Sequence, residues 1–184
     1  PAGVRIPPGA QMVIFASSKN RTDPAAVLHT DFNLSGAGEY LSLAAPDGTV
    51  LSEFAPAFPS QVSGVSYGFP PGGGPAGYFK PATPASPNGS AFAGLTADTA
   101  FSMDRGFYDA PVDVAITCST PGAEIRYTLD GTAPTASEGS LYSAPLHITG
   151  TTTLRAAAFL AGWAPSNVDT HTYIFPAQVL QQPA

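Results

Sequence analysis

Apolar and polar residues alternate with a period of two through much of the chain, which is the pattern of half-buried β-strands. Two runs in the second half of the chain show it most clearly. The apolar positions of both runs are expected to point into the core of an all-β domain. These positions are Val112, Val114, Ile116 and Cys118 in the first run, and Ile125, Tyr127 and Leu129 in the second.

Three further strands are predicted after these runs, at residues 146–148, 151–159 and 169–175. Residues 154–161 are rich in alanine, and helix propensity alone would favour a helix there. The threonines before this segment and the glycine after it favour a strand instead. Short strands at this spacing are typical of a β-sandwich.

The first half of the chain shows a weaker form of the same pattern. Residues 39–45 and 49–54 flank an Asp-Gly pair, which predicts a β-hairpin. The short apolar run at residues 12–15 predicts a strand that is buried on both faces. In the segment 27–34, the alternation predicts a strand with an apolar face. That face consists of Leu28, Phe32 and Leu34.

Proline and glycine dominate residues 69–94, between the two halves. Proline lacks the N–H group that a sheet interior requires, so this stretch is predicted to be an extended linker or a surface loop. The predicted organisation therefore has four parts. They are a first β domain at residues 1–78, a linker at 79–99, a second β domain at 100–176 and a tail at 177–184.

Composition and charge exclude several classes of protein. The 184 residues include 19 glycines and 20 prolines, which argues against an all-helical fold. A net charge of -6 argues against a nucleic-acid-binding protein with a basic patch. No apolar run reaches the roughly 18 residues of a membrane-spanning helix, so no membrane insertion is expected. A single cysteine, Cys118, excludes an intrachain disulfide and a cysteine-based metal site.

Residues 121–135 (PGAEIRYTLDGTAPT) resemble the core signature of the chitobiase/β-hexosaminidase C-terminal domain family. The segments 105–108 (RGFY), 151–156 (TTTLRA) and 162–166 (GWAPS) extend the resemblance to about residues 100–175. The resemblance implies an immunoglobulin-like β-sandwich that is appended to extracellular enzymes and surface proteins. It also implies that the domain has no catalytic residues of its own.

The first part of the chain is similar to the C-terminal portion of a bacterial lamin-tail domain. The similar segments are 13–17 (VIFAS), 28–32 (LHTDF), 38–41 (GEYL) and 65–68 (VSYG). This resemblance also implies an immunoglobulin-like sandwich. In larger bacterial proteins the two domains often accompany a CotH-kinase-like region, but nothing in this chain matches the active site of that kinase.

The opening strands of the lamin-tail family have no counterpart ahead of Pro1. The chain also lacks an initiator methionine, so we expect a processed or excised piece of a longer protein with a truncated first domain. A sandwich without its first strands leaves backbone groups unpaired and part of an apolar face uncovered. We therefore expect residues 12–15 and the apolar face of residues 27–34 to be short of partners, and the first domain to self-associate through an exposed edge.

One segment matches the sequence pattern of a catalytic motif but lacks the structural context that the motif requires. Residues 64–68 (GVSYG) have the G-x-S-x-G form of a nucleophile elbow, which requires a helix directly after the serine. The residues that follow, 69–75 (FPPGGGP), are unable to form that helix. Ser66 is therefore predicted to lie at a strand end and not to act as a nucleophile.

The histidines, acidic residues and cysteine give no chemical site. His29, His147 and His171 alternate with apolar neighbours and are expected on the polar faces of their strands, without metal-ligand spacing. Cys118 is expected to be a buried hydrophobic residue. Four aspartates close together in the sequence could together surround Ca²⁺, but the residue spacing of a calcium-binding loop is absent. Their carboxylates are therefore predicted to be solvated. This group consists of Asp98, Asp104, Asp109 and Asp113.

Aromatic residues are the remaining candidates for a binding site, because sugar rings stack on exposed aromatic faces. Phe107, Tyr108, Tyr142 and Trp163 lie near predicted loops and are the candidate carbohydrate-contact residues. The alternative is that Trp163 packs into the core or closes one end of the sandwich.

The sequence favours a non-catalytic spacer, docking or adhesion segment of a larger bacterial secreted or cell-surface protein. The alternative is a carbohydrate-binding module that targets a linked enzyme to polysaccharide. An enzyme is the weakest hypothesis, because no carboxylate pair, triad or metal cluster is predicted. No cofactor is expected. The expected partners are other domains of the same polypeptide, surface proteins or polysaccharide.

Overall fold

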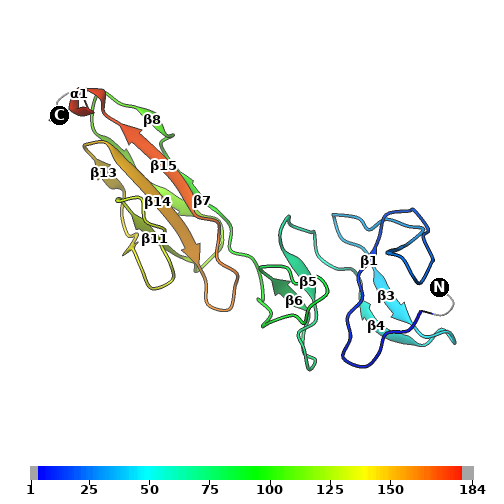
Figure 1. The fold of residues 1–184 in the computed structure, drawn as a ribbon. Helices are drawn as coiled ribbons and strands as arrows, with labels where there is room; N and C mark the ends of the chain where they lie inside the picture. Colours follow the sequence, from blue (N-terminus) through cyan, green and yellow to red (C-terminus); the bar gives the residue numbers. More distant parts are fainter. Residues whose placement is uncertain (1–3, 180–184) are drawn as a thin grey trace. The chain divides into compact units, whose positions relative to one another are not determined.

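The computed structural model describes residues 4–179 and divides the chain into two compact units, residues 1–91 and residues 92–184. Strands make up nearly all of the secondary structure, and the described part of the chain contains one helix of four residues, α1 (Pro176–Val179). None of its helices has the length and apolar character needed to cross a membrane. The predicted all-β class is confirmed (Figure 1).

A five-stranded sheet forms one layer of the second unit, and its longest strands are visible in Figure 1. Neighbouring strands are antiparallel except for the last pair, which is parallel. In spatial order the strands are β12 (Ser140–Leu141), β11 (Glu124–Thr128), β14 (Thr152–Phe159), β15 (Asp169–Ile174) and β8 (Gly106–Phe107).

Two antiparallel strand pairs form the opposite layer. β7 (Thr99–Phe101) pairs with β10 (Ile116–Cys118), and β9 (Val112–Val114) pairs with β13 (Leu146–Ile148). Side chains from both layers meet in one core, which is the immunoglobulin-like sandwich expected from the sequence. The buried core residues are Val114, Ile116, Ile148, Leu154, Ala156, Tyr173 and Phe175.

Tyr173 is fully buried in this core and still satisfies its hydroxyl group. The hydroxyl donates a hydrogen bond of 3.0 Å to the carbonyl oxygen of Met103. Burial, with smaller contributions from Tyr108 and Asp104, raises the pKa of Tyr173 to about 12. The phenol therefore stays protonated, and remains a donor, throughout the neutral pH range.

The run of alternating residues from 112 to 118 forms two strands where the sequence suggested one. Val114 and Ile116 are buried, as the alternation predicts. Between them, the N–H of Ala115 donates to the Ser102 hydroxyl at 2.8 Å, and the N–H of Ser102 donates to the Ala115 carbonyl at 2.9 Å. The chain changes its partner from β13 to β7 at this point, while the inward face continues unchanged.

One predicted inward residue is wrong. Leu129 is 46% exposed, because β11 ends at Thr128 and Leu129 opens the following turn. Asp130 fixes that turn by accepting hydrogen bonds from the N–H and the hydroxyl of Thr132. Ile125 and Tyr127 are half-buried and pack against the core, as predicted.

The alanine-rich segment is a strand, as predicted. β14 pairs with β11 on one side and with β15 on the other. Ala156, Ala157 and Ala158 are each at most 1% exposed, so both faces of this central strand are covered. Burial on both faces and pairing on both edges outweigh the helix propensity of alanine.

The first unit consists of three two-stranded sheets. β1 (Ile14–Phe15) pairs in parallel with β2 (Leu28–His29). β3 (Leu41–Ala44) and β4 (Val50–Phe54) form the predicted hairpin, in which Asp47 accepts a hydrogen bond from the N–H of Thr49 at 2.9 Å. β5 (Ser66–Gly68) pairs with β6 (Gly77–Phe79).

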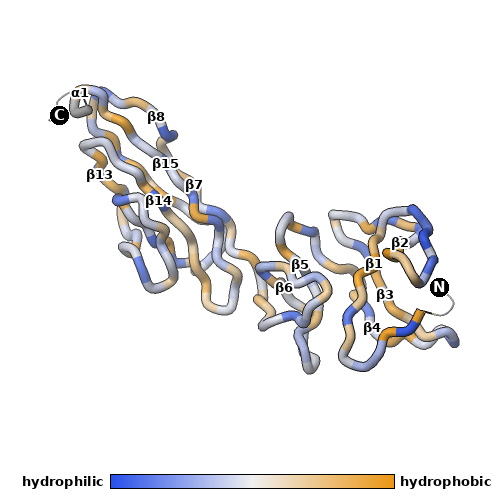
Figure 2. Tube along the Cα trace, in the orientation of Figure 1, coloured by the Kyte–Doolittle hydropathy of each residue, from blue (hydrophilic) through white to orange (hydrophobic). Residues whose placement is uncertain are grey.

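The apolar side chains of the first unit are more exposed than the predicted burial on both faces of a strand would allow. The run 12–15 was predicted to be buried on both faces, but its side chains are 37–50% exposed. Leu28 is buried, whereas Phe32 and Leu34 are more than 40% exposed. β1 and β2 have two residues each, so too little sheet forms to cover these side chains. Figure 2 shows hydrophobic residues along β1 and β3.

The segment predicted as a linker carries structure at both ends. β6 forms an edge strand despite the prolines around it, because none of its own residues is proline. At the other end, the N–H of Ala93 donates to the Gly162 carbonyl at 2.9 Å, and the N–H of Thr96 donates to the Ala164 carbonyl at 2.9 Å. Residues 80–98, between β6 and β7, contain none of the named strands, and residues 80–91 of this stretch belong to the first unit.

We expect limited proteolysis to cut within residues 80–91, where most side chains are exposed, and to leave a stable C-terminal fragment. A protease of broad specificity, followed by mass spectrometry of the fragments, measures this. Retention of Trp163 fluorescence in the fragment would show that the second unit stays folded. Resistance of residues 80–91, together with a single cooperative unfolding transition of the whole chain, would contradict the prediction.

Candidate functional site

The four aromatic residues proposed from the sequence do not form one platform. Phe107 is 75% exposed on β8, which pairs with the end of β15 at Ile174. Trp163 follows the far end of β14, a strand of eight residues that spans about 23 Å. A single sugar ring is unable to contact both positions.

Tyr108 and Tyr142 serve the fold. The Tyr108 hydroxyl donates to the Asp104 carbonyl at 2.6 Å, and its ring lies 5.7 Å from that of Tyr173. The Tyr142 hydroxyl accepts the N–H of Ile116 at 3.0 Å. Both rings pack against the core and both hydroxyl groups are bonded within the fold, so these two tyrosines hold the sandwich together.

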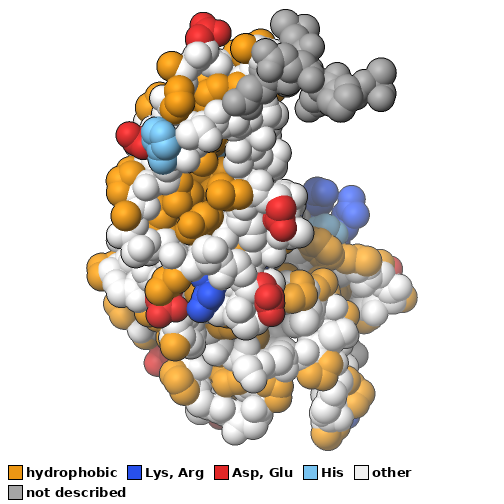
Figure 3. All heavy atoms as spheres, turned by 90° about the vertical axis from the view of Figure 1, so that its left-hand side faces the viewer, with side chains coloured by type: hydrophobic (Ala, Val, Ile, Leu, Met, Phe, Trp, Pro, Cys, Tyr) orange, Lys and Arg blue, Asp and Glu red, His pale blue; other side chains and the backbone are white. Residues whose placement is uncertain are grey.

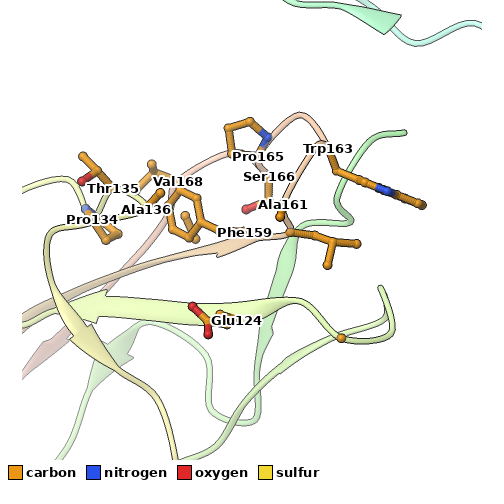
Figure 4. Close-up of a pocket in the computed structure, with 13 residues that line it drawn as sticks. Glu124, Pro134, Thr135, Ala136, Phe159, Ala161, Trp163, Pro165, Ser166 and Val168 are labelled. Carbon is orange, nitrogen blue, oxygen red and sulfur yellow. The ribbon is translucent and has the colours of Figure 1, made fainter. Parts of the chain in front are cut away.

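A groove of about 780 Å³ lies on the outer face of the five-stranded sheet, at the end of β14 (Figure 4). Glu124 of β11 and Phe159 of β14 pair across the floor of this groove. Ala157, on the same face, also borders the groove but is itself covered. The groove therefore comes from the register of two neighbouring strands.

The loop between β11 and β12 forms the first wall, which includes Pro134 and Thr135. Arg126 donates from Nη1 to the Gly139 carbonyl at 3.1 Å, and Arg155 donates from Nη1 to the Gly131 carbonyl at 3.0 Å. These two arginines project from the outer face of the sheet and hold both ends of the loop against it. The wall is therefore fixed to the strands below it.

The segment 163–168 forms the second wall. The N–H of Ala164 donates to the Gly94 carbonyl at 3.0 Å, and the N–H of Ala158 donates to the Ser166 hydroxyl at 2.8 Å. A Cβ atom at Gly94 would lie 2.6 Å from the indole of Trp163. Only glycine therefore allows the indole to pack directly on the backbone at this position.

The chemistry of the groove is that of a binding surface. Its lining is mostly apolar, and Glu124 is its one charged side chain. Ser166 already uses its hydroxyl, which accepts from Ala158 and donates to the Asn167 carbonyl at 2.7 Å. Within residues 4–179, no group of three or more His, Cys, Asp or Glu side chains is arranged to hold a metal ion.

The other residues weighed in the sequence lie apart from the groove. Ser66 belongs to β5 in the first unit and is followed by a turn. Asp98 accepts hydrogen bonds from the backbone and side chain of Asn167, and Asp113 contacts His147 at 2.7 Å. The four aspartates weighed as calcium ligands thus have separate roles or stay solvated.

Two of the three histidines differ from the prediction of a polar face. His147 is exposed, as predicted. His29 is half-buried, accepts or donates a hydrogen bond of 2.7 Å with the Ser17 hydroxyl, and stacks on Phe15. His171 is half-buried and stacks on Phe101 with the ring centres 4.4 Å apart. Aromatic neighbours on adjacent segments partly cover these two imidazoles.

Cys118 is half-buried rather than fully buried, and its thiol donates to the Ala97 carbonyl at 3.2 Å. This hydrogen bond joins the end of β10 to the segment ahead of β7. The cysteine therefore has a structural contact on the edge of the core.

Acidification is expected to destabilise the first unit through His29. Partial desolvation, then Arg21 and Lys19, lower the pKa of this imidazole below its usual 6.5. The folded unit therefore binds fewer protons than the unfolded chain just below pH 6.5. The contribution of His29 to the free energy of unfolding is complete above pH 6.5 and is lost as the pH falls from 6.5 to the lower pKa of the folded state.

An NMR titration of the His29 ring protons measures this effect. The midpoint should lie below that of a model histidine, and it should rise in Arg21→Gln. A midpoint at or above the usual value in the native chain would contradict the prediction.

The sequence pattern indicates Trp163 as a candidate but does not indicate Glu124 or Phe159. Both of these residues occupy outward positions in the alternation, as ordinary strand residues do. Only the register that places Glu124 opposite Phe159, beside the loop after β14, shows that they line one groove. The apolar cluster Phe159-Leu160 directly before the Gly162 turn was the available signal.

Comparison with known families supports the resemblance found in the second half of the chain. Residues 103–170 match the family described as the chitobiase/beta-hexosaminidase C-terminal domain. No curated protein and no solved structure matches the chain. The lamin-tail resemblance of residues 1–78 stays a prediction.

Proposed function

We propose that the chain is a non-catalytic spacer, docking or adhesion segment of a larger secreted or cell-surface protein of bacterial origin. The observation that carries this proposal is the match of residues 103–170 to a domain family named for its place at the C-terminus of glycosidases. A complete sandwich core lies under the matched segment. Such a module contributes position and contacts to a neighbouring domain.

The groove supports a binding role better than a catalytic one. Glycoside hydrolysis normally uses two carboxyl groups about 5–10 Å apart. Among the residues that line the groove, Glu124 is the one carboxylate. A single exposed carboxylate between apolar walls suits recognition of a ligand.

A carbohydrate-binding module is the second proposed function, and the groove is the observation that favours it. Its lining combines two aromatic rings with an acidic hydrogen-bond acceptor. As a carbohydrate-binding module, the chain would target a linked enzyme to polysaccharide. As a spacer or docking segment, it would hold that enzyme away from a surface or dock on another domain.

Two measurements on the purified chain test the proposed function. Aryl glycosides of glucose and N-acetylglucosamine should show no turnover above the buffer rate. Fluorescently labelled chain should be retained on bacterial cell envelopes, with the heat-unfolded chain as the control. Turnover that disappears in Glu124→Gln would contradict the non-catalytic role, and absence of retention would contradict docking.

A further inference from the structure

We infer that the groove at the end of β14 is the contact site for a glycan chain that carries no acidic groups. The inference rests on the proposed accessory function and adds a site and a ligand class to it. Three side chains carry the argument, and they come from two strands and one loop. They are Glu124, Phe159 and Trp163.

The two aromatic rings offer separate contact points. Phe159 and Trp163 are both half-buried, so each retains accessible ring surface. In Figure 4, Phe159 lies between the two walls, whereas the indole of Trp163 projects away from them. Sugar rings have apolar faces that pack on aromatic side chains. Two separate rings suit a chain of several sugar units better than one isolated ring does.

Contacts within the fold hold both walls of the groove in place without a ligand. Arg126 and Arg155 hold the first wall, and the packing of Trp163 on Gly94 holds the second. Asp98 adds two hydrogen bonds to Asn167, within the second wall. Binding therefore orders few side chains, which favours recognition of a weakly hydrophobic ligand such as a sugar.

Charge decides which glycans fit. Glu124 is exposed and carries carboxylate oxygens that are able to accept hydrogen bonds, and the lining has no lysine or arginine. The second unit contains eight acidic residues and three arginines, of which Arg126 and Arg155 point Nη1 at loop carbonyls. On the face drawn in Figure 3, acidic side chains and a basic one stand among hydrophobic and uncharged ones. Hydroxyl groups complement this surface, whereas uronates and sulfated sugars are repelled.

A peptide fits the groove less well than a glycan. An extended peptide gains much of its affinity from main-chain pairing with a free strand edge. The floor strands β11 and β14 pair with each other as far as Glu124 and Phe159, whereas β14 pairs with β15 only as far as Ala156. Beyond that point the N–H and the carbonyl of Ala158 are bonded to Ser166, so β14 offers an extended peptide no open edge at the groove.

The test begins with the whole chain on an array of neutral, amino and acidic oligosaccharides. The tightest binder is then titrated while Trp163, the one tryptophan in the chain, reports contact through its fluorescence. We expect saturable binding to neutral or amino oligosaccharides and at least tenfold weaker binding to acidic ones. For variants that lack the indole, isothermal titration calorimetry measures the binding affinity instead.

Variants locate the contact. Phe159→Ala and Trp163→Ala should each weaken binding about tenfold, and Glu124→Gln about threefold. Phe159→Leu keeps an apolar side chain in the groove but removes the flat ring, so it should also weaken binding. This variant serves as the test if Phe159→Ala fails to fold. Phe107→Ala, at the far end of the sandwich, is the matched control and should bind like the native chain.

A silent array, preferred binding to acidic sugars, or tighter binding to a proline-rich peptide would overturn the inference. Equal binding by the native chain and both aromatic variants would also overturn it. The proposed function fails separately, through glycoside turnover or loss of retention on cell envelopes. A silent array with normal retention would thus remove the glycan site and leave the docking role.

Discussion

Replacement of Leu154 by alanine should destabilise the second unit by about 2–5 kcal/mol. Leu154 is fully buried near the start of β14, between two paired strands, so the cavity left behind has little room to collapse. A loss of this size approaches the whole stability of a small domain. Denaturant titration followed by Trp163 fluorescence measures it for this unit alone, since the first unit contains no tryptophan.

Leu129→Ala is the matched control for this prediction. Leu129 is 46% exposed in a turn, so its truncation should change the free energy of unfolding by about 0.5 kcal/mol or less. Ile125→Ala should fall between the two, because Ile125 packs against the core but stays half-buried. Equal losses for Leu129→Ala and Leu154→Ala would show that the inward face is assigned wrongly.

The first unit should make the chain self-associate as its concentration rises. The exposed large hydrophobic side chains of the described residues lie mostly in this unit, whereas the second unit exposes Phe107, Leu129 and Leu141. β3 and β4 pair only with each other, and a groove of about 410 Å³ between this hairpin and β1 is lined mainly by apolar groups. Open edges beside apolar surface attract other strands.

Sedimentation velocity over a hundredfold range of concentration measures the association. Leu43→Lys, which adds a charge to the groove, should shift the chain towards monomer. Val62→Lys is the matched control, because Val62 is 50% exposed but lies outside the groove lining. Hydrogen exchange at residues 11–17 should be fast in dilute solution and slower in concentrated solution. Slow exchange there in a chain that stays monomeric would refute the prediction.

Alternation predicted the second unit well because one face of each strand is buried by the opposite layer. Val114 and Ile116 are buried as expected, although the chain changes its pairing partner at Ala115. A change of partner leaves the side-chain period intact, so the pattern in the sequence does not record it. The end of β11 was missed for a similar reason, since Leu129 continues the alternation past the last paired residue.

Alternation predicted the first unit less well. An apolar residue such as Phe15 or Phe32 shows that burial would be favourable, but it does not show that a partner is present. The strand lengths depend on those partners, so β1 contains two residues where a longer strand was expected. The prolines around β6 likewise hid a short edge strand, because proline excludes only the positions that it occupies.

The groove was not predictable from the sequence, because it depends on strand register. Glu124 and Phe159 are 35 positions apart and meet only through the register of β11 and β14. Trp163 was singled out as an aromatic residue near a loop, but it was grouped with Phe107, which lies beyond the other end of the same strand. Sequence reasoning identified a suitable residue type and lacked the pairing that gives it neighbours.

The path of the chain through the second unit has a mechanical consequence. The chain enters at Ala93 to Thr96, which are bonded to residues 162–164 after the end of β14. It leaves at Phe175, whose N–H donates to Thr151 just before the start of the same strand. Tension applied at the two ends therefore runs along β14 and β15 and loads their hydrogen bonds in shear, so that many must break together. Single-molecule stretching should show this unit yielding at a higher force than the short strand pairs of the first unit.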